Sequence, residues 1–271
     1  MWRKGIERKS PRELGIMREA GRINALALEA ARKVIHPGVT TAEIDAAARE
    51  VLRKFRAKSA FLGYPGAYPY PAVTNVCVNE ELVHAIPGKR RIREGDLVTV
   101  DCGTIVDEYH ADSAFTVGVG EISEAARRLM EVTEAAMWVG IDLIRPGKRT
   151  GDVSSAIQHY VESHGYHVVK EYTGHGIGRS MHEDPQLPNF GKAGRGTVLR
   201  PGITVAVEPM VLVGTDQTVV LNDEWTVISR DRSLTAHFEH TVAVTDGEPL
   251  ILTAMDSSVA LPVSAWAQVP A

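Results

Sequence analysis

The fold of this chain is decided by REGDLVTVD (residues 93–101), a turn followed by an apolar strand that ends in a carboxylate. The same pattern returns as RPGITVAVE (residues 200–208), again with glycine in third place and an acid in last place. β-Branched residues dominate both runs, which predicts buried strands. An isolated buried charge is costly, so Asp101 and Glu208 must each be paired, hydrogen-bonded or bound to a cation.

A second repeat supports an internal duplication. The stretch IHPGVTTAEI (residues 35–44) returns as IRPGKRTGDV (residues 144–153), and the offset is nearly the same as for the strand repeat. Two repeats in the same order predict two copies of a helix–helix–strands unit. Two such halves, packed about a pseudo-twofold axis, would bring Asp101 and Glu208 to a common centre.

Helix and strand signals fill in both halves. Capping boxes at Ser10 and Thr40 predict helices that run up to Pro37 and to about Arg56, and a third helix is expected from Ser123 to Ile144. Strand-like segments cover residues 73–78, 97–106, 109–119, 168–172, 203–213, 225–229 and 238–244. Runs of strands separated by helix pairs predict an α+β fold with a mixed or antiparallel sheet.

The composition is that of an ordinary globular chain. Its 271 residues are 44% hydrophobic and 24% charged, with a formal net charge of −4, which gives no electrostatic footprint for nucleic acid. The start is charged without an apolar stretch after it, and no segment approaches the roughly 18 apolar residues of a membrane span. The two cysteines do not make a disulfide framework, so a cytoplasmic protein is expected.

Further candidate metal ligands lie in or beside strand-like segments. Asp112, His175 and Glu239 join Asp101 and Glu208 in apolar surroundings, and one shared cation site would account for all five. Four carboxylates and one imidazole form a hard donor set that suits Mn²⁺, Fe²⁺ or Co²⁺ at least as well as Zn²⁺. The sequence therefore predicts a metalloenzyme.

The order and spacing of these motifs resemble the type I methionine aminopeptidases, in their bacterial form. The matching elements are Asp101 and Asp112, YTGHGIG (residues 172–178), HEDP (residues 182–185), EPM (residues 208–210) and FEHT (residues 238–241). The resemblance implies the pita-bread fold: two pseudo-symmetric halves around a central, curved, mostly antiparallel sheet flanked by helices. It covers a single catalytic domain, taken as residues 1–252, and leaves residues 253–271 as a disordered or loosely packed tail.

The resemblance also implies a role for each site residue. Asp112 and Glu239 would bridge two divalent ions, Asp101 would bind one of them, and His175 with Glu208 would bind the other. Glu208 would also take the proton of the attacking water. His182 would steady the scissile carbonyl, and His84 would hydrogen-bond the substrate amide nitrogen and take part in proton delivery.

The pocket for the substrate's first side chain is expected at Phe61, Tyr64, Met181 and Trp225, by the same resemblance. Three positions depart from the family pattern: Met181 replaces a usual Phe, Asn75 a usual Cys and Ala85 a usual Gly. The stretch PGAYPYPAV (residues 65–73) is longer than in typical bacterial members. This stretch either reshapes the opening of the pocket or forms a rigid surface loop.

The resemblance implies removal of the initiator methionine from nascent chains with a small second residue. The expected partners are nascent N-termini at the ribosome. Neither a membrane nor sequence-specific binding of nucleic acid is expected, and the enzyme is expected to act as a monomer. An Xaa-Pro aminopeptidase and a non-catalytic pita-bread binding protein are the alternatives. The physiological metal is not encoded in the identity of the ligands.

Overall fold

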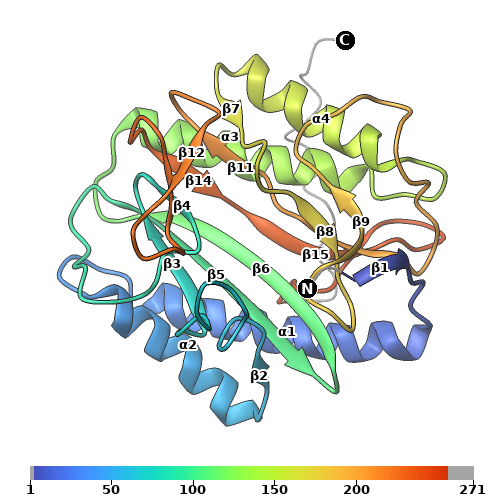
Figure 1. Ribbon diagram of the computed structural model, residues 1–271, viewed down its shortest axis with the longest axis horizontal. Coiled ribbons are helices and arrows are strands. Elements are labelled where there is room, and N and C mark those ends of the chain that lie inside the picture. The colour runs from blue at the N-terminus through green and yellow to red at the C-terminus, as the bar shows by residue number, and fades with distance from the viewer. Residues whose placement is uncertain (1–2, 256–271) are drawn as a thin grey trace.

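The computed structural model describes residues 3–255, in which two helix pairs flank a ten-stranded sheet (Figure 1). The first pair is α1 (Pro11–Lys33) and α2 (Thr41–Phe55), and the second is α3 (Glu124–Asp142) and α4 (Thr150–Ser163). Helix α1 packs on strands β5 and β6, whereas α3 packs on β10 and β15 among others. The main hydrophobic core lies between these helices and the sheet.

The sheet follows the order β1-β9-β8-β10-β15-β6-β5-β2, with β16 paired to β15 and β3 paired to β5. Its strands are β1 (Arg3–Ile6), β2 (Lys58–Ser59), β3 (Thr74–Val78), β5 (Leu97–Val106), β6 (Tyr109–Gly118), β8 (Gly174–Gly176), β9 (Glu183–Leu187), β10 (Thr204–Val207), β15 (Glu239–Ala243) and β16 (Leu250–Ile251). Two small sheets are formed by β14 (Thr235–His237), β11 (Met210–Leu212) and β7 (His167–Val168), and by β12 (Thr218–Val220), β13 (Val227–Ser229) and β4 (Glu81–Val83). Every pairing is antiparallel except that of β1 with β9.

The predicted capping boxes are present at both helices of the first half. The backbone N–H of Ser10 donates to Glu13 Oε2 at 2.8 Å, and that of Thr40 donates to Glu43 Oε2 at 2.8 Å. Each N-cap hydroxyl accepts in return from the backbone N–H of its glutamate. The sequence pattern therefore located the starts of α1 and α2 correctly.

Matching backbone contacts in the two halves support the predicted duplication. The N–H of Gly38 donates to Ile92 O, and the N–H of its counterpart Gly147 donates to Leu199 O. Isolated β-bridges likewise join Thr40 to Arg91 and Arg149 to Val198. The Pro-Gly turn of each half is thus tied to the segment that leads into a central strand, β5 in one half and β10 in the other.

Two predicted strands depart most clearly from the structure. The segment 203–213 divides into β10 and β11 at Glu208-Pro209, because proline has no backbone N–H to donate to the ladder. Only Val168 of the predicted strand 168–172 is in a strand, and residues 171–173 instead line a cavity. Both departures lie at the candidate site.

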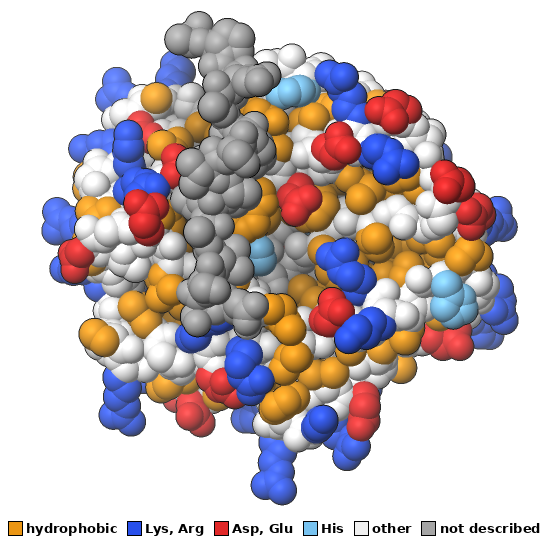
Figure 2. Space-filling model, turned by 180° about the vertical axis from the view of Figure 1, so that it is seen from behind, with side chains coloured by type: hydrophobic (Ala, Val, Ile, Leu, Met, Phe, Trp, Pro, Cys, Tyr) orange, Lys and Arg blue, Asp and Glu red, His pale blue; other side chains and the backbone are white. Residues whose placement is uncertain are grey.

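On the face drawn in Figure 2, basic and acidic side chains are interspersed over the surface, as a net charge of −4 would suggest. Among the described residues, none of the helices has the length and apolar character that crossing a membrane requires. At the start of the predicted tail, Thr253 and Ala254 are buried, and Arg18 Nη1 donates to Ala254 O at 2.6 Å. The rest of that tail, residues 256–271, lies outside the described residues.

Candidate metal centre and active-site cavity

Strand register places all five candidate ligands on one face of the sheet. Ala114 on β6 lies opposite Asp101 on β5 and opposite Glu239 on β15. Because side chains alternate along a strand, Asp112, two residues from Ala114, shares their face. The small side chain of Ala114 leaves room for the carboxylates on either side.

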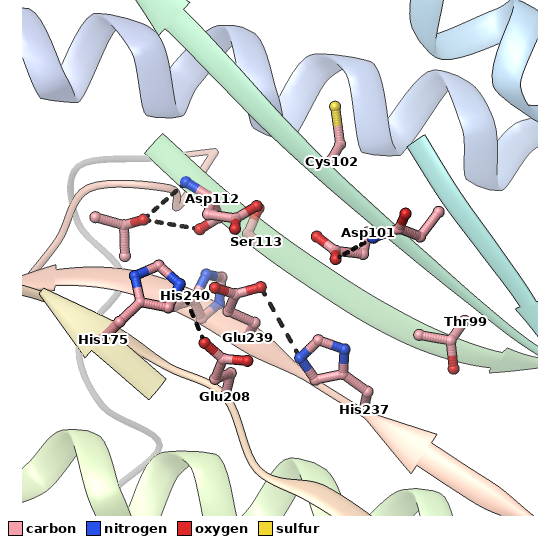
Figure 3. A network of polar contacts seen from close by, with 12 residues as sticks. Thr99, Asp101, Cys102, Asp112, Ser113, His175, Glu208, His237, Glu239 and His240 are labelled. Carbon is pink, nitrogen blue, oxygen red and sulfur yellow. Dashed lines mark hydrogen bonds and ion pairs between the residues drawn. The ribbon is translucent and has the colours of Figure 1, made fainter. Parts of the chain in front are cut away.

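The second half supplies the other two ligands by the same rule. His175 on β8 lies opposite Ala206, which lies opposite Thr241, two residues from Glu239. Glu208 follows Ala206 by two residues, directly after β10 ends. Figure 3 shows the five candidate ligands together, from β5, β6, β8, β15 and the segment that follows β10.

The ligand atoms are close enough to share cations. One atom each from Asp112, His175 and Glu239 lies within 4.8 Å of the others. His175 Nε2 is 3.3 Å from Glu208 Oε1. Asp101 belongs to the same cluster, since it approaches Asp112 closely enough for the two carboxyls to interact. The structure therefore assembles the set that the sequence predicted.

The electrostatics of the cluster call for a bound cation. Burial raises the pKa of Asp101 to about 7. Burial and the neighbouring carboxylates raise the pKa values of Asp112, Glu208 and Glu239 well above the usual range. One oxygen of each carboxylate lacks a hydrogen-bond partner among the described residues. Orphaned buried oxygens in a hard donor set fit divalent metal ions.

Neighbouring side chains hold the ligands in place. Thr241 Oγ1 accepts from the N–H of Asp112 at 2.9 Å and donates to its carbonyl at 2.8 Å. Asn75 on β3 lies opposite Asp101 on β5, and its Nδ2 donates to Asp101 Oδ2 at 2.9 Å. The residue that stands in place of the family's cysteine thus contacts a candidate metal ligand directly, a contact that the sequence did not predict.

The cluster of candidate ligands lies in a cavity of about 280 Å³. The lining includes every residue of the predicted side-chain pocket, namely Phe61, Tyr64, Met181 and Trp225, together with both predicted histidines, His84 and His182. His84 follows β4 with a φ of 60°, a left-handed conformation that is strained for a residue with a Cβ. Burial lowers the pKa of His84 to about 4, and burial with His175 and His84 nearby lowers that of His182 to about 2. Both rings are therefore neutral near pH 7.

Several cavity residues were missed from the sequence, among them His237. His237 is buried, and neither ring nitrogen has a hydrogen-bond partner among the described residues. Its Nε2 lies 3.9 Å from Glu239 Oε2 (Figure 3). The sequence did hold one signal for His237: it stands two residues before Glu239. Residues two apart in an extended chain point to the same side. Tyr70, Glu171, Tyr172, Thr173 and Met210 also line the cavity without having been predicted.

Comparisons with known proteins agree with this geometry. The model of metallopeptidase family M24 matches residues 15–246. The chain is 47% identical over 245 residues to methionine aminopeptidase 1 of Bacillus subtilis, covering 90% of this chain and 98% of that protein. A crystal structure of methionine aminopeptidase from Thermotoga maritima is 46% identical, with a TM-score of 0.89, and the match covers 92% of this chain and 99% of that one.

A less similar solved structure shares the fold alone. The prolidase from Pyrococcus horikoshii shares the fold, with a TM-score of 0.73 and 23% identity, but the match covers only 65% of that chain. The pita-bread fold is thus confirmed, and the methionine aminopeptidases match this chain along nearly their whole length. The chain belongs to metallopeptidase family M24, and within that family it stands with the bacterial methionine aminopeptidases.

Proposed function

We propose that this chain is a dinuclear metal-dependent aminopeptidase that removes the initiator methionine from nascent proteins with a small second residue. The observation that carries the proposal is the cluster of four carboxylates and one histidine in a cavity with aromatic walls. Asp101, Asp112, His175, Glu208 and Glu239 would hold two ions of Mn²⁺, Fe²⁺, Co²⁺ or Zn²⁺. Divalent ions, when bound, supply Lewis acidity and lower the pKa of water at the site.

The chain's own residues would perform the remaining chemistry. Glu208 Oε1 lies 3.3 Å from His175 Nε2 within the cluster, and we assign Glu208 the proton of the attacking water. His182 would donate a hydrogen bond to the scissile carbonyl oxygen as negative charge develops there, which is where such a bond accelerates the reaction. His84 would contact the substrate amide nitrogen.

The walls of the cavity suit a methionine side chain. Phe61, Tyr64 and Trp225 offer aromatic rings, and Met181 adds a flexible thioether. A thioether packs well against ring edges, so a methionine would gain more than a branched apolar residue of similar size. These contacts support assignment of the pocket to the first residue of the substrate.

We extend the proposal to the domain, the partners and the location. Residues 1–252 would form the catalytic domain of a cytoplasmic monomer that acts on nascent N-termini at the ribosome, without a membrane or sequence-specific nucleic acid. The names and full-length match of the bacterial relatives support this setting.

The proposal is tested by release of free methionine from the peptides Met-Ala-Ser and Met-Leu-Ser. Metal-free protein is supplied with Mn²⁺, Fe²⁺, Co²⁺ or Zn²⁺ in turn. Metal-dependent cleavage of the first peptide but not the second is expected. Cleavage of Xaa-Pro peptides instead would favour the prolidase-like alternative, and no cleavage of either would favour a binding protein.

Metal removal is expected to make the stability of the protein fall as pH rises above 7. The unfolded pKa of a carboxyl is about 4, whereas burial and repulsion raise the folded pKa values of Asp101, Asp112, Glu208 and Glu239. The folded state then binds more protons than the unfolded state. The stability that these protonated carboxyls contribute is therefore lost as pH rises through their folded-state pKa values. The buried histidines shift the balance only below about pH 6.5, where the unfolded rings take up protons.

This pH dependence is measured as the thermal midpoint with a chelator at pH 7 and pH 8.5. The metal-loaded protein is the control. Its thermal midpoint should change little between the two pH values, because metal binding already keeps the carboxylates deprotonated. Equal slopes for the two forms would contradict the assignment of these carboxylates as metal ligands.

A further inference from the structure

The hydroxyl of Tyr64 lies against one particular nitrogen of His182. Tyr64 Oη is 2.7 Å from His182 Nδ1, and the two rings meet edge to face with centroids 5.6 Å apart. These residues are 118 positions apart in the sequence. Sequence reasoning assigned Tyr64 to the side-chain pocket, yet its polar atom contacts the catalytic histidine.

The direction of this hydrogen bond follows from the surroundings of Tyr64. Within residues 3–255 the hydroxyl has no other hydrogen-bond partner, and the side chain is half-buried. A phenol that accepted from Nδ1 would leave its own proton without an acceptor among the described residues. Tyr64 therefore donates, and Nδ1 accepts. A neutral imidazole carries one proton, which must then be on Nε2.

We propose that Tyr64 is a positioning residue that holds His182 in the tautomer with its proton on Nε2. In this state His182 presents a donor, rather than a lone pair, to the carbonyl oxygen of the substrate. The inference rests on the proposed function for the identity of that substrate. It gives Tyr64 a role in the chemistry in addition to its place in the pocket wall.

The longer stretch at residues 65–73 anchors Tyr64 for this role. The N–H of Tyr70 donates to Tyr64 O at 2.9 Å, and the buried Tyr70 hydroxyl is bonded to Ala85 O at 3.0 Å. Trp225 closes over the stretch: its ring centroid is 5.0 Å from that of Tyr70, and a Cβ at Gly66 would lie 2.4 Å from its ring. The stretch is thus packed against the cavity wall and fixes the backbone of Tyr64.

The loop that carries His182 is held from the other side. The N–H of His110 donates to Gly178 O at 2.7 Å. Glu183, the residue after His182, accepts from the N–H of Ser180 at 3.0 Å and pairs with Lys9 at 2.6 Å. Both partners are therefore held in position for the hydrogen bond between Tyr64 and His182.

The test is Tyr64→Phe, which removes the hydroxyl and keeps the ring. Histidine ring nitrogens are labelled with ¹⁵N in the full chain, with and without Zn²⁺, and the His182 signals are identified by their loss in His182→Ala. The wild type is expected to show His182 protonated on Nε2, with Nδ1 as an acceptor. In Tyr64→Phe the Nδ1 resonance should move toward its unbonded value, and kcat should fall by about tenfold, the equivalent of one hydrogen bond.

Tyr166→Phe is the matched control, because Tyr166 is partly buried but does not line the cavity. It should leave the His182 resonances and kcat unchanged. A wild-type proton on Nδ1 would overturn the proposal. So would a Tyr64→Phe variant in which either the His182 resonances or kcat is unaltered. The ¹⁵N resonances of His182 are measured without any substrate turnover. If the wild type releases no methionine, that result contradicts the proposed function but leaves the assignment of the tautomer to be decided by the resonances.

Discussion

Replacing Asp112 by asparagine is expected to lower kcat by roughly a thousandfold or more while leaving the fold intact. Asp112 lies at the centre of the cluster, with a ligand atom within 4.8 Å of those of His175 and Glu239. The amide is nearly the same shape as the carboxylate but carries no charge to hold a divalent ion. Lewis-acid stabilisation of the transition state is worth several kcal/mol, which corresponds to this loss in rate.

The same variant should be at least as stable as the wild type when both are metal-free near pH 8. Burial, Glu239 and Asp101 all disfavour a charge on Asp112, so removing that charge relieves repulsion. Calorimetry would measure metal affinity, and thermal unfolding would measure stability. A metal-free Asp112→Asn protein that unfolds well below the wild type would instead indicate that Asp112 has a structural role.

Asp45→Asn is the matched control, because Asp45 is a buried carboxylate outside the cavity. Its Oδ1 accepts from the N–H groups of Val73 and Thr74 and from the Thr74 hydroxyl, each at 2.9 Å. We expect this variant to bind metal normally but to lose about 1–3 kcal/mol of stability, because the amide nitrogen would replace Oδ2, which accepts from Arg49 Nη2 at 2.9 Å. The two variants thus separate metal binding from structural hydrogen bonding.

Replacing Lys9 by methionine is expected to reduce the free energy of unfolding by about 3–5 kcal/mol, or roughly 10 °C in Tm. Lys9 Nζ lies 2.6 Å from Glu183 Oε2, and the two side chains are only 3% and 1% exposed. Removal of the lysine would leave the Glu183 charge buried and unpaired. Gly178 is required beside this pair, because a Cβ there would lie 2.4 Å from Lys9 Cε.

The double variant Lys9→Met with Glu183→Gln should recover most of the lost stability, because no uncompensated charge remains. Lys170→Met removes the cation of an exposed ion pair with Asp216, and its effect should be too small to resolve in the same assay. A Lys9→Met variant as stable as the wild type would show that the ion pair between Lys9 and Glu183 does not stabilise the fold.

Much of the candidate site was predictable because strand patterns have a period of two. Asp101 and Glu208 ended matching repeats, and Asp112 and Glu239 lay in apolar runs, so a shared face was a reasonable expectation. The segment 168–172 shows the limit of this reasoning. Its β-propensity predicted a strand, but its later residues border the cavity, where packing and not propensity decides the backbone.

The sequence by itself determined the helix starts, the duplicated plan and the candidate metal ligands, because caps, turns and periodicity are local signals. Only the tertiary structure decided which distant side chains meet. Tyr64 contacts His182 across 118 positions and Lys9 contacts Glu183 across 174, and no local pattern encodes either contact. His237 likewise became a cavity residue only when β14 was seen beside the cluster. Long-range contacts depend on how whole elements pack, and that packing orients the catalytic groups.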